Sequence, residues 1–125
     1  MIPTTFPRRP TRVVRVGDVV IGGDNPVVVQ SMITAETHDV PAAVEQIIAM
    51  HRAGAEIVRV TTPNLQEARC LGEIRDEVRR RYRDVPLVAD VHHQGSAIAV
   101  EVARYVQKIR INPGLFVFRR PAART

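Results

Sequence analysis

The sequence predicts an α/β fold, the amino-terminal half of a (β/α)8 TIM barrel preceded by a β-hairpin. Four short apolar runs alternate with three amphipathic stretches, which indicates parallel strands joined by right-handed helical crossovers. The alternative, an open doubly wound sheet for a dinucleotide, would have a G-x-G-x-x-G turn after its first strand. Residues 31–37, which span the end of that strand and the turn after it, contain no glycine, so the barrel is favoured. The 125 residues are expected to form one partial barrel domain, since a whole barrel has about 250.

The first elements are a hairpin and a strand. Residues 12–16 and 19–21 are mainly apolar around Gly17-Asp18, a hairpin signal that predicts a hairpin over residues 12–21. Residues 22–26 contain two glycines and a proline and break the chain. The run at 27–32 is mostly apolar, which predicts a strand buried on both faces.

The first helix and second strand follow a polar loop. Asp39 is placed to cap a helix with Pro41 in its first turn, and Gly54 is placed to end it after Ala53. Residues 57–61 then predict the second strand.

The second helix begins at Pro63-Asn64, where Asn64 and Glu67 have capping-box spacing. Its other face carries a basic run that is most simply a solvated surface. The face expected to be buried carries residues at steps of three and four, namely Leu65, Ala68, Leu71, Ile74, Val78 and Tyr82.

The remaining elements are a strand at 86–92, a short helix at 96–106 and a strand at 108–114, with none predicted after residue 115. A half barrel leaves two strand edges unpaired and its inner face uncovered. We therefore expect a fragment that is marginally stable or self-associates in isolation.

Composition excludes several classes of protein. The net charge is +5 and Lys108 is the only lysine, so arginine carries the positive charge and suits phosphate or nucleic acid. Aromatic residues are 4%, which argues against a nucleic-acid-binding module. No apolar run approaches the roughly 20 residues of a membrane span, and no signal peptide is visible, so a cytoplasmic location is expected. Cys70 is the only cysteine, which precludes an internal disulfide or a thiolate metal site.

Polar residues stand near the end of every predicted strand, where barrel enzymes place their sites. The side chains at these ends are Gln30, Arg59, Thr61, Asp90, His92, Arg110 and Asn112, with the apolar Met32 beside Gln30 and residues two apart on one face. A salt bridge between Arg59 and Asp90 is one explanation; convergence of four strand ends favours a ligand site.

The residue types indicate a phosphorylated substrate. Arg59, Arg110 and Asn112 are expected to bind phosphoryl oxygens, with Gln30 and Met32 beside them. Asp90 and His92 are the catalytic candidates, because a carboxylate that fixes an imidazole tautomer can share its proton. The other histidines are expected to be structural or on the surface, and no histidine–carboxylate set has metal spacing, so no metal site is predicted.

The same segments carry a family resemblance. Gln30-Ser31-Met32 with Thr34, Thr37 and Asp39 is similar to the QSM-x-T-x-x-T-x-D stretch of the 4-hydroxy-3-methylbut-2-enyl diphosphate synthase family. Residues 53–60, 88–92 and 108–114 resemble its next three strand regions, and the opening residues 8–12 also fit. The resemblance covers nearly the whole chain, in four ordered motifs.

The resemblance implies the function of the family. Its members convert 2-C-methyl-D-erythritol 2,4-cyclodiphosphate to 4-hydroxy-3-methylbut-2-enyl diphosphate in non-mevalonate isoprenoid biosynthesis, as oxidoreductases. It implies ferredoxin or flavodoxin as electron donor, a four-iron four-sulfur cluster on a separate carboxyl-terminal domain, and a homodimer. By position it implies that Arg59, Arg110 and Asn112 hold the diphosphate, with Asp90 and His92 near the reacting carbons. The cluster's ligands have no counterpart here, so the chain alone is expected to be inactive.

Two departures leave alternatives open. His93 stands where the family usually has phenylalanine, and Leu115 follows the Asn112-Pro113-Gly114 motif where many members have asparagine. The second change fits either the longer three-domain form of the family or a point where the chain leaves it. A different barrel enzyme for a phosphorylated metabolite, without a cluster, is the alternative function.

Overall fold

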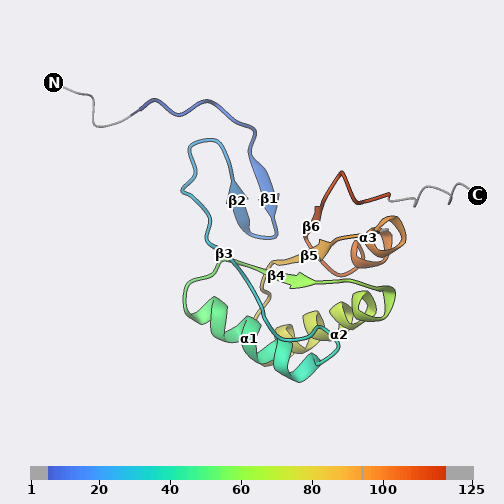
Figure 1. Cartoon of the computed structure of the whole chain (residues 1–125). Helices are drawn as coiled ribbons and strands as arrows, with labels where there is room; N and C mark the ends of the chain where they lie inside the picture. Colours follow the sequence, from blue (N-terminus) through green and yellow to red (C-terminus); the bar gives the residue numbers. More distant parts are fainter. Residues whose placement is uncertain (1–5, 94, 118–125) are drawn as a thin grey trace, which may run out of the picture.

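The computed structural model describes residues 6–93 and 95–117, which form a hairpin, a parallel sheet and one layer of helices (Figure 1). The elements in order are β1 (Val14–Val16), β2 (Val19–Ile21), β3 (Gln30–Met32), α1 (Val40–Arg52), β4 (Ile57–Thr61), α2 (Leu65–Arg81), β5 (Leu87–Val91), α3 (Ser96–Val102) and β6 (Lys108–Ile111).

The sheet has the strand order of a barrel segment. β3, β4, β5 and β6 are parallel and each pairs with the next strand along the chain. The helices lie together on one side of this sheet, with α2 packed against both α1 and α3 (Figure 1). A doubly wound sheet would reverse its strand order and carry helices on both faces, so the predicted partial barrel is confirmed.

The sheet curves so that its two edge strands approach each other on the concave side. Lys108 Nζ on β6 donates to Gln30 Oε1 on β3 at 3.3 Å, although two strands separate them in the sheet. A flat sheet with strands about 4.8 Å apart would hold these edges too far apart for that contact. The concave face is therefore the interior of the incipient barrel.

Local signals set the helix boundaries as predicted. The Asp39 carboxylate accepts from Ala42 N at 3.2 Å, and Asn64 Oδ1 accepts from Glu67 N at 2.9 Å. Gly54, which follows the C-cap residue Ala53 of α1, has a φ of +113°, which a residue with a side chain rarely adopts. The capping box at α2 is incomplete, because the Glu67 carboxylate hydrogen-bonds His38 instead of the backbone.

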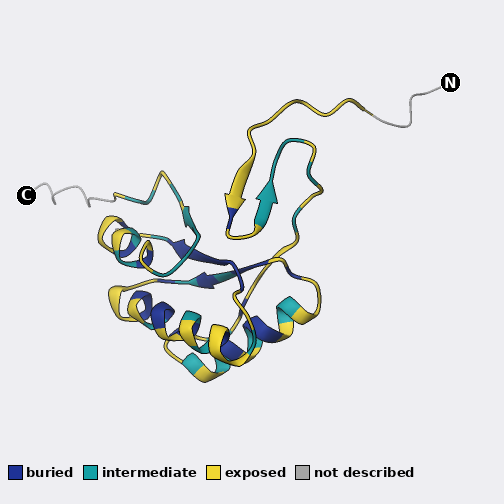
Figure 2. Ribbon diagram, turned by 180° about the vertical axis from the view of Figure 1, so that it is seen from behind, coloured by how far each residue is buried: buried dark blue, intermediate teal, exposed yellow. Residues whose placement is uncertain are grey.

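Two apolar clusters hold the fold together. The larger lies between the sheet and the helices (Figure 2), and its largest fully buried side chains are Ile47, Val44, Val58, Val60, Leu71, Ile74, Val78, Leu87, Val91 and Val102. The smaller joins Val16 of the hairpin to Ile57 and Val88 on the concave face of the sheet. Because these two residues lie toward the amino-terminal ends of β4 and β5, the hairpin covers that end and leaves the carboxyl ends open.

The prediction for the first strand was wrong in length and burial. β3 contains only residues 30–32, and all three are exposed. Val29 N donates to the Glu56 carboxylate, and the Val29 carbonyl accepts from Glu56 N and Ile57 N; the paired residues of the ladder begin at Gln30. β3 is an edge strand of the described sheet, which explains why its side chains are uncovered.

Three smaller predictions also need correction. The helix expected at 96–106 ends at Val102, and Tyr105 and Val106 pack on the core from the following turn. The strand expected at 108–114 ends at Ile111, where Asn112 begins a turn. Leu65 is 40% exposed, because it is the first residue of α2 and lies beyond the contact between helices. The stretch after residue 115, where no element is predicted, is described only as far as residue 117, so residues 118–125 lie outside the described residues.

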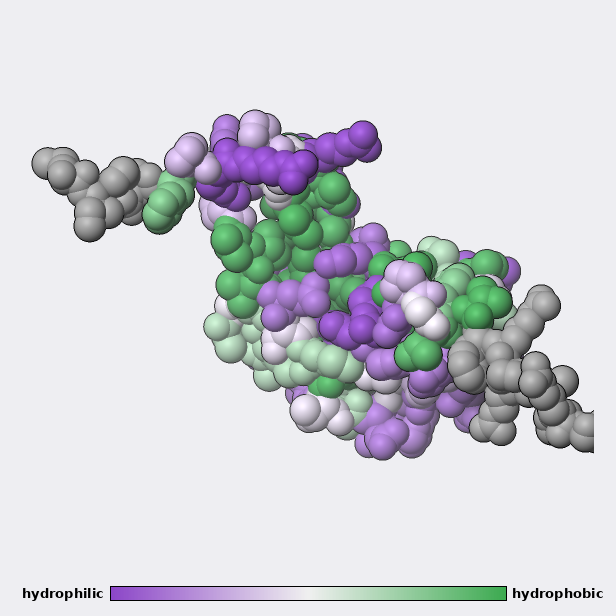
Figure 3. Space-filling view, turned by 45° about the horizontal axis from the view of Figure 1, so that its top comes forward, coloured by the Kyte–Doolittle hydropathy of each residue, from purple (hydrophilic) through white to green (hydrophobic). Residues whose placement is uncertain are grey.

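The surface carries an apolar area over the hairpin and the segment leading to β3, next to hydrophilic surface (Figure 3). Its exposed residues are Val13, Val14, Val27 and Val29. Within the described residues, α2 and the other helices are all too short or too polar to cross a bilayer.

Candidate functional site

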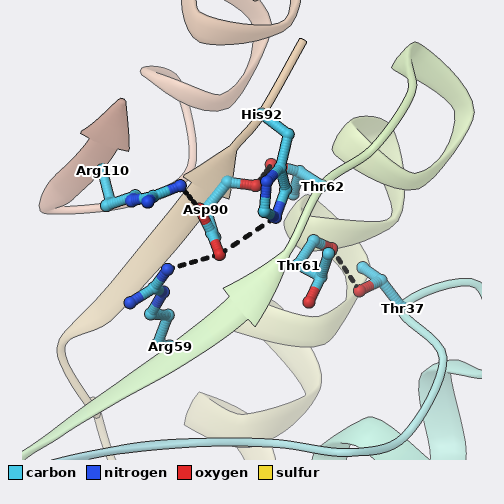
Figure 4. A network of polar contacts seen from close by, with 7 residues as sticks. All are labelled: Thr37, Arg59, Thr61, Thr62, Asp90, His92 and Arg110. Carbon is cyan, nitrogen blue, oxygen red and sulfur yellow. Dashed lines mark hydrogen bonds and ion pairs between the residues drawn. The ribbon is translucent and has the colours of Figure 1, made fainter. Parts of the chain in front are cut away.

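Three neighbouring strands bring an aspartate, two arginines and a histidine together at their carboxyl ends (Figure 4). The sheet register aligns Thr61 of β4 with Asp90 of β5, and Asp90 with Arg110 of β6. Arg59 stands two residues before Thr61 and so projects from the same, concave face. His92 follows the end of β5 on that side. The sequence prediction that these four side chains meet in one place is borne out by their contacts.

Asp90 is the centre of the cluster. Its Oδ2 lies 2.5 Å from Arg59 Nη2 and 3.2 Å from His92 Nε2, and its Oδ1 lies 3.0 Å from Arg110 Nη1. Asp90 is 1% exposed, whereas the arginine side chains are 25% and 36% exposed. The ion pair between Arg59 and Asp90, one of the two explanations open from the sequence, is therefore present as part of a larger network.

The electrostatics of the cluster favour an ionised carboxylate. Burial by itself raises the pKa of Asp90, but the hydrogen bond from Arg59 and the charges of Arg59, His92 and Arg110 outweigh it and lower the pKa below its ordinary value. An aspartate held by several cations stays negative at neutral pH.

The backbone beneath the cluster is fixed by two threonines. Thr62 is fully buried, and both its N–H and its Oγ1 donate to the Asp90 carbonyl at 3.0 Å. Thr37 Oγ1 donates to the Thr61 carbonyl at 2.5 Å, joining the loop before α1 to the end of β4. The Thr62 hydroxyl thus joins the carboxyl ends of β4 and β5, and the Thr37 hydroxyl joins the preceding loop to β4 (Figure 4).

The cluster retains capacity to bind an anion. Each guanidinium has five N–H donors, yet within residues 6–93 and 95–117 each uses a single nitrogen, on Asp90. Arg59 Nε is buried and has no partner in the described part of the chain. Two arginines against one aspartate leave a net charge of +1 before His92 is counted. The arrangement therefore suits an oxygen-rich anion such as a phosphoryl group.

The other predicted substrate residues lie around this cluster. Met32 of β3 is in register with Arg59, on the concave side, and is exposed. Gln30 lies two residues before Met32 in β3, and its Oε1 accepts from Lys108 Nζ. Asn112 Oδ1 accepts from Gly114 N at 3.1 Å, so the side-chain amide oxygen of Asn112 supports the turn after β6. The structure does not bring Asn112 into the Asp90 network.

Sequence reasoning missed two features near the site. The buried role of Thr62 could have been suspected, since a polar residue directly after a buried strand needs a partner. The second feature is a group of three possible ligand atoms on Glu36, His38 and Glu67, within 4.8 Å of one another. No sequence spacing reveals this group, because His38 and Glu67 are brought together over 29 residues, with Nδ1 and Oε1 2.9 Å apart. The side chains of Glu36 and His38 are mostly exposed.

The remaining histidines and the cysteine take no part in the cluster. His51 Nδ1 lies 2.9 Å from the Tyr82 hydroxyl and links the ends of α1 and α2. His93 is exposed, and Cys70 lies partly buried in α2, where burial raises the pKa of its thiol.

Comparison with known proteins gives one consistent answer. The GcpE TIM-barrel domain model matches residues 11–124. Curated proteins named 4-hydroxy-3-methylbut-2-en-1-yl diphosphate synthase (ferredoxin) are similar over nearly the whole chain. The protein from Synechococcus sp. (strain JA-2-3B'a(2-13)) is 60% identical over 93% of this chain and 28% of its own length. Those from Parasynechococcus marenigrum (strain WH8102) and Gloeobacter violaceus (strain ATCC 29082 / PCC 7421) are 62% and 61% identical over 94% of this chain.

The chain spans about 30% of the length of these curated relatives. The matched region of the family model contains every residue of the cluster around Asp90. The family model covers nearly all of the described fold and the identities are near 60%, which agrees with the partial barrel. This chain belongs to the GcpE TIM-barrel domain family.

Proposed function

We propose that this chain is the amino-terminal, substrate-binding part of the barrel of a 4-hydroxy-3-methylbut-2-en-1-yl diphosphate synthase. The reaction is the reductive opening of 2-C-methyl-D-erythritol 2,4-cyclodiphosphate, an oxidoreductase step of isoprenoid biosynthesis. The observation that carries the proposal is the pair Arg59 and Arg110, held on one carboxylate at the open end of a barrel segment. Identity near 60% to proteins with that name supports the choice of reaction.

The site geometry suggests a role for each of the side chains at the strand ends. Arg59 and Arg110 bind oxygens of the diphosphate through the guanidinium donors that Asp90 does not use. His92, with its side chain 41% exposed beside the arginines, is assigned the role of binding or protonating a substrate oxygen. Met32 and Gln30 line the concave face next to them, and Asn112 positions the turn after β6.

The family resemblance implies a four-iron four-sulfur cluster, but the residues of this chain do not fit one. Such a cluster is held by several cysteine thiolates, and Cys70 is the only cysteine in the sequence. Cys70 also lies in α2, in the helix layer and away from the concave face. The role proposed for this chain is therefore substrate binding, with no step assigned to a cluster.

The proposal extends to partners and location. Ferredoxin is the favoured electron donor over flavodoxin, because the similar proteins carry it in their names. A homodimer of the complete enzyme in the cytoplasm is proposed from the family resemblance. The alternative function is a cluster-free barrel enzyme for another phosphorylated metabolite, which the same arginine pair would serve.

The test is an assay of the complete gene product with the cyclic diphosphate and reduced ferredoxin. We expect turnover that requires iron, and a loss of at least a hundredfold in kcat/KM for Arg59→Ala and for Arg110→Ala, since each removes a charge-assisted contact with the substrate. Arg79→Ala, at an exposed ion pair with Asp84, is the matched control and should keep its activity. An active, iron-free enzyme for a different phosphate ester would establish the alternative. The 125 residues alone are expected to show no turnover.

A further inference from the structure

We propose that Asp90 is a positioning residue, which holds the two guanidinium groups and the imidazole in place for an anionic ligand and transfers no proton itself. The sequence suggests an acid–base partnership between Asp90 and His92, and the contacts assign the aspartate a different task. The identity of the anion rests on the proposed function, whereas the positioning role rests on the geometry alone.

The carboxylate has little capacity left for chemistry. Its two oxygens already receive three cationic or polar partners, Arg59, Arg110 and His92, at 2.5 to 3.2 Å. At 1% exposure, Asp90 itself presents almost no surface to a ligand. Its three partners are 25% to 41% exposed, so they are the groups of this cluster that a ligand can reach.

The main chain of Asp90 is as tightly held as its side chain. Its carbonyl accepts from both Thr62 N and Thr62 Oγ1, each at 3.0 Å. β5 pairs with β4 on one side and β6 on the other, so Asp90 lies on a central strand of the described sheet. A group fixed by both its backbone and its side chain is suited to orienting mobile neighbours.

The neighbours are the residues that need orienting. An arginine side chain loses rotamer entropy when it is immobilised, a cost that weakens any ligand contact made from a mobile state. Asp90 immobilises both arginines before a ligand arrives, and each retains further donors. The negative charge of Asp90 opposes an incoming anion, so positioning and simple electrostatics predict opposite effects when that charge is removed.

The experiment compares Asp90→Asn with the wild type in the complete gene product. The matched control is Asp84→Asn, which removes the carboxylate of an exposed pair with Arg79 Nε. Rotation of the arginine guanidinium groups is measured by side-chain ¹⁵N NMR, and the affinity for inorganic pyrophosphate by calorimetry. The pH dependence of turnover is recorded for each variant that is active.

We expect Asp90→Asn to release the restricted rotation of Arg59 and Arg110 and to weaken pyrophosphate binding about tenfold or more, with the shape of the pH profile unchanged. Asp84→Asn should alter neither. Unchanged or tighter pyrophosphate binding, or a changed pH profile with unchanged affinity, would overturn the positioning role. If the wild type binds no pyrophosphate while Asp90→Asn still releases both arginines, the positioning role stands and the proposed function fails.

A second variant covers the case in which Asp90→Asn does not fold. Asp90→Glu retains the charge and an ionisable carboxylate but displaces it by one methylene. Positioning predicts weaker pyrophosphate binding for this variant, together with altered rotation of Arg59 and Arg110. Wild-type affinity in a folded Asp90→Glu protein would refute it.

Discussion

Thr62 offers a quantitative test of how the strand ends are held. It is fully buried, and its hydroxyl donates to the Asp90 carbonyl, which also accepts from Thr62 N. Thr62→Val removes the hydroxyl and keeps the shape of the side chain. Because the carbonyl retains its second donor, no acceptor is left without a partner, and the loss should be the net value of one hydrogen bond, about 1 kcal/mol.

Two further substitutions separate the hydroxyl from the methyl group. Thr62→Ser keeps the hydroxyl and removes a buried methyl, which costs about 1 kcal/mol of transfer and cavity free energy. Thr62→Ala removes both groups and should cost about 2 kcal/mol. The series therefore predicts two similar single losses and a double loss near their sum.

Urea denaturation followed by circular dichroism measures these values. With a slope of about 1.5 kcal/mol per molar urea, Thr62→Val and Thr62→Ser should each lower the midpoint by about 0.7 M, and Thr62→Ala by about 1.3 M. The slope itself should not change. If Thr62→Val is as stable as the wild type, or if Thr62→Ser and Thr62→Ala are equally destabilised, the hydroxyl contributes nothing and the reasoning is refuted.

Three other predictions concern a cap, a histidine and acid stability. Asn64→Ala should destabilise the protein by about 1 kcal/mol in the same urea assay, because Asn64 Oδ1 caps α2 through Glu67 N, and Asn64→Ser should recover most of it. The pKa of His38 is raised mainly by its hydrogen bond to Glu67, so Glu67→Gln should lower it in an NMR titration; an unchanged His38 pKa would contradict that contact. The pKa of Asp90 is lower in the folded state than its unfolded value of about 3.9, so its contribution to stability is present above about pH 4 and lost as the pH falls through the folded pKa. Acid titrations of stability should therefore be less steep for Asp90→Asn than for the wild type, and equal slopes would contradict the shift.

Much of the fold was predictable because its signals are local. Two helix starts are marked by Asp39 and Asn64, whose side chains accept from a backbone N–H three residues later. The end of α1 is marked by Gly54, whose own backbone has a positive φ. The structure confirms all three signals. The alternation within each strand likewise places Arg59 with Thr61 and Asp90 with His92, since residues two apart on a strand share a face.

Errors arose where an element depends on its neighbours. The run at 27–32 has the composition of a buried strand, yet the ladder begins only at Gln30, because Glu56 bonds both backbone groups of Val29. Composition also cannot show that β3 is an edge strand in the described sheet, and edge position is what exposes its residues.

The sequence by itself determined the order of elements, the helix caps and the set of polar residues at the strand ends, because each of these is encoded within a few residues. Only the tertiary structure decided how those polar residues pair. The register of β4, β5 and β6 brings Arg59 and Arg110 onto one carboxylate from 31 and 20 residues away, and it leaves Asn112 in a turn. Pairing depends on distances between strands, and those distances are set by the packing of the whole sheet rather than by any local pattern.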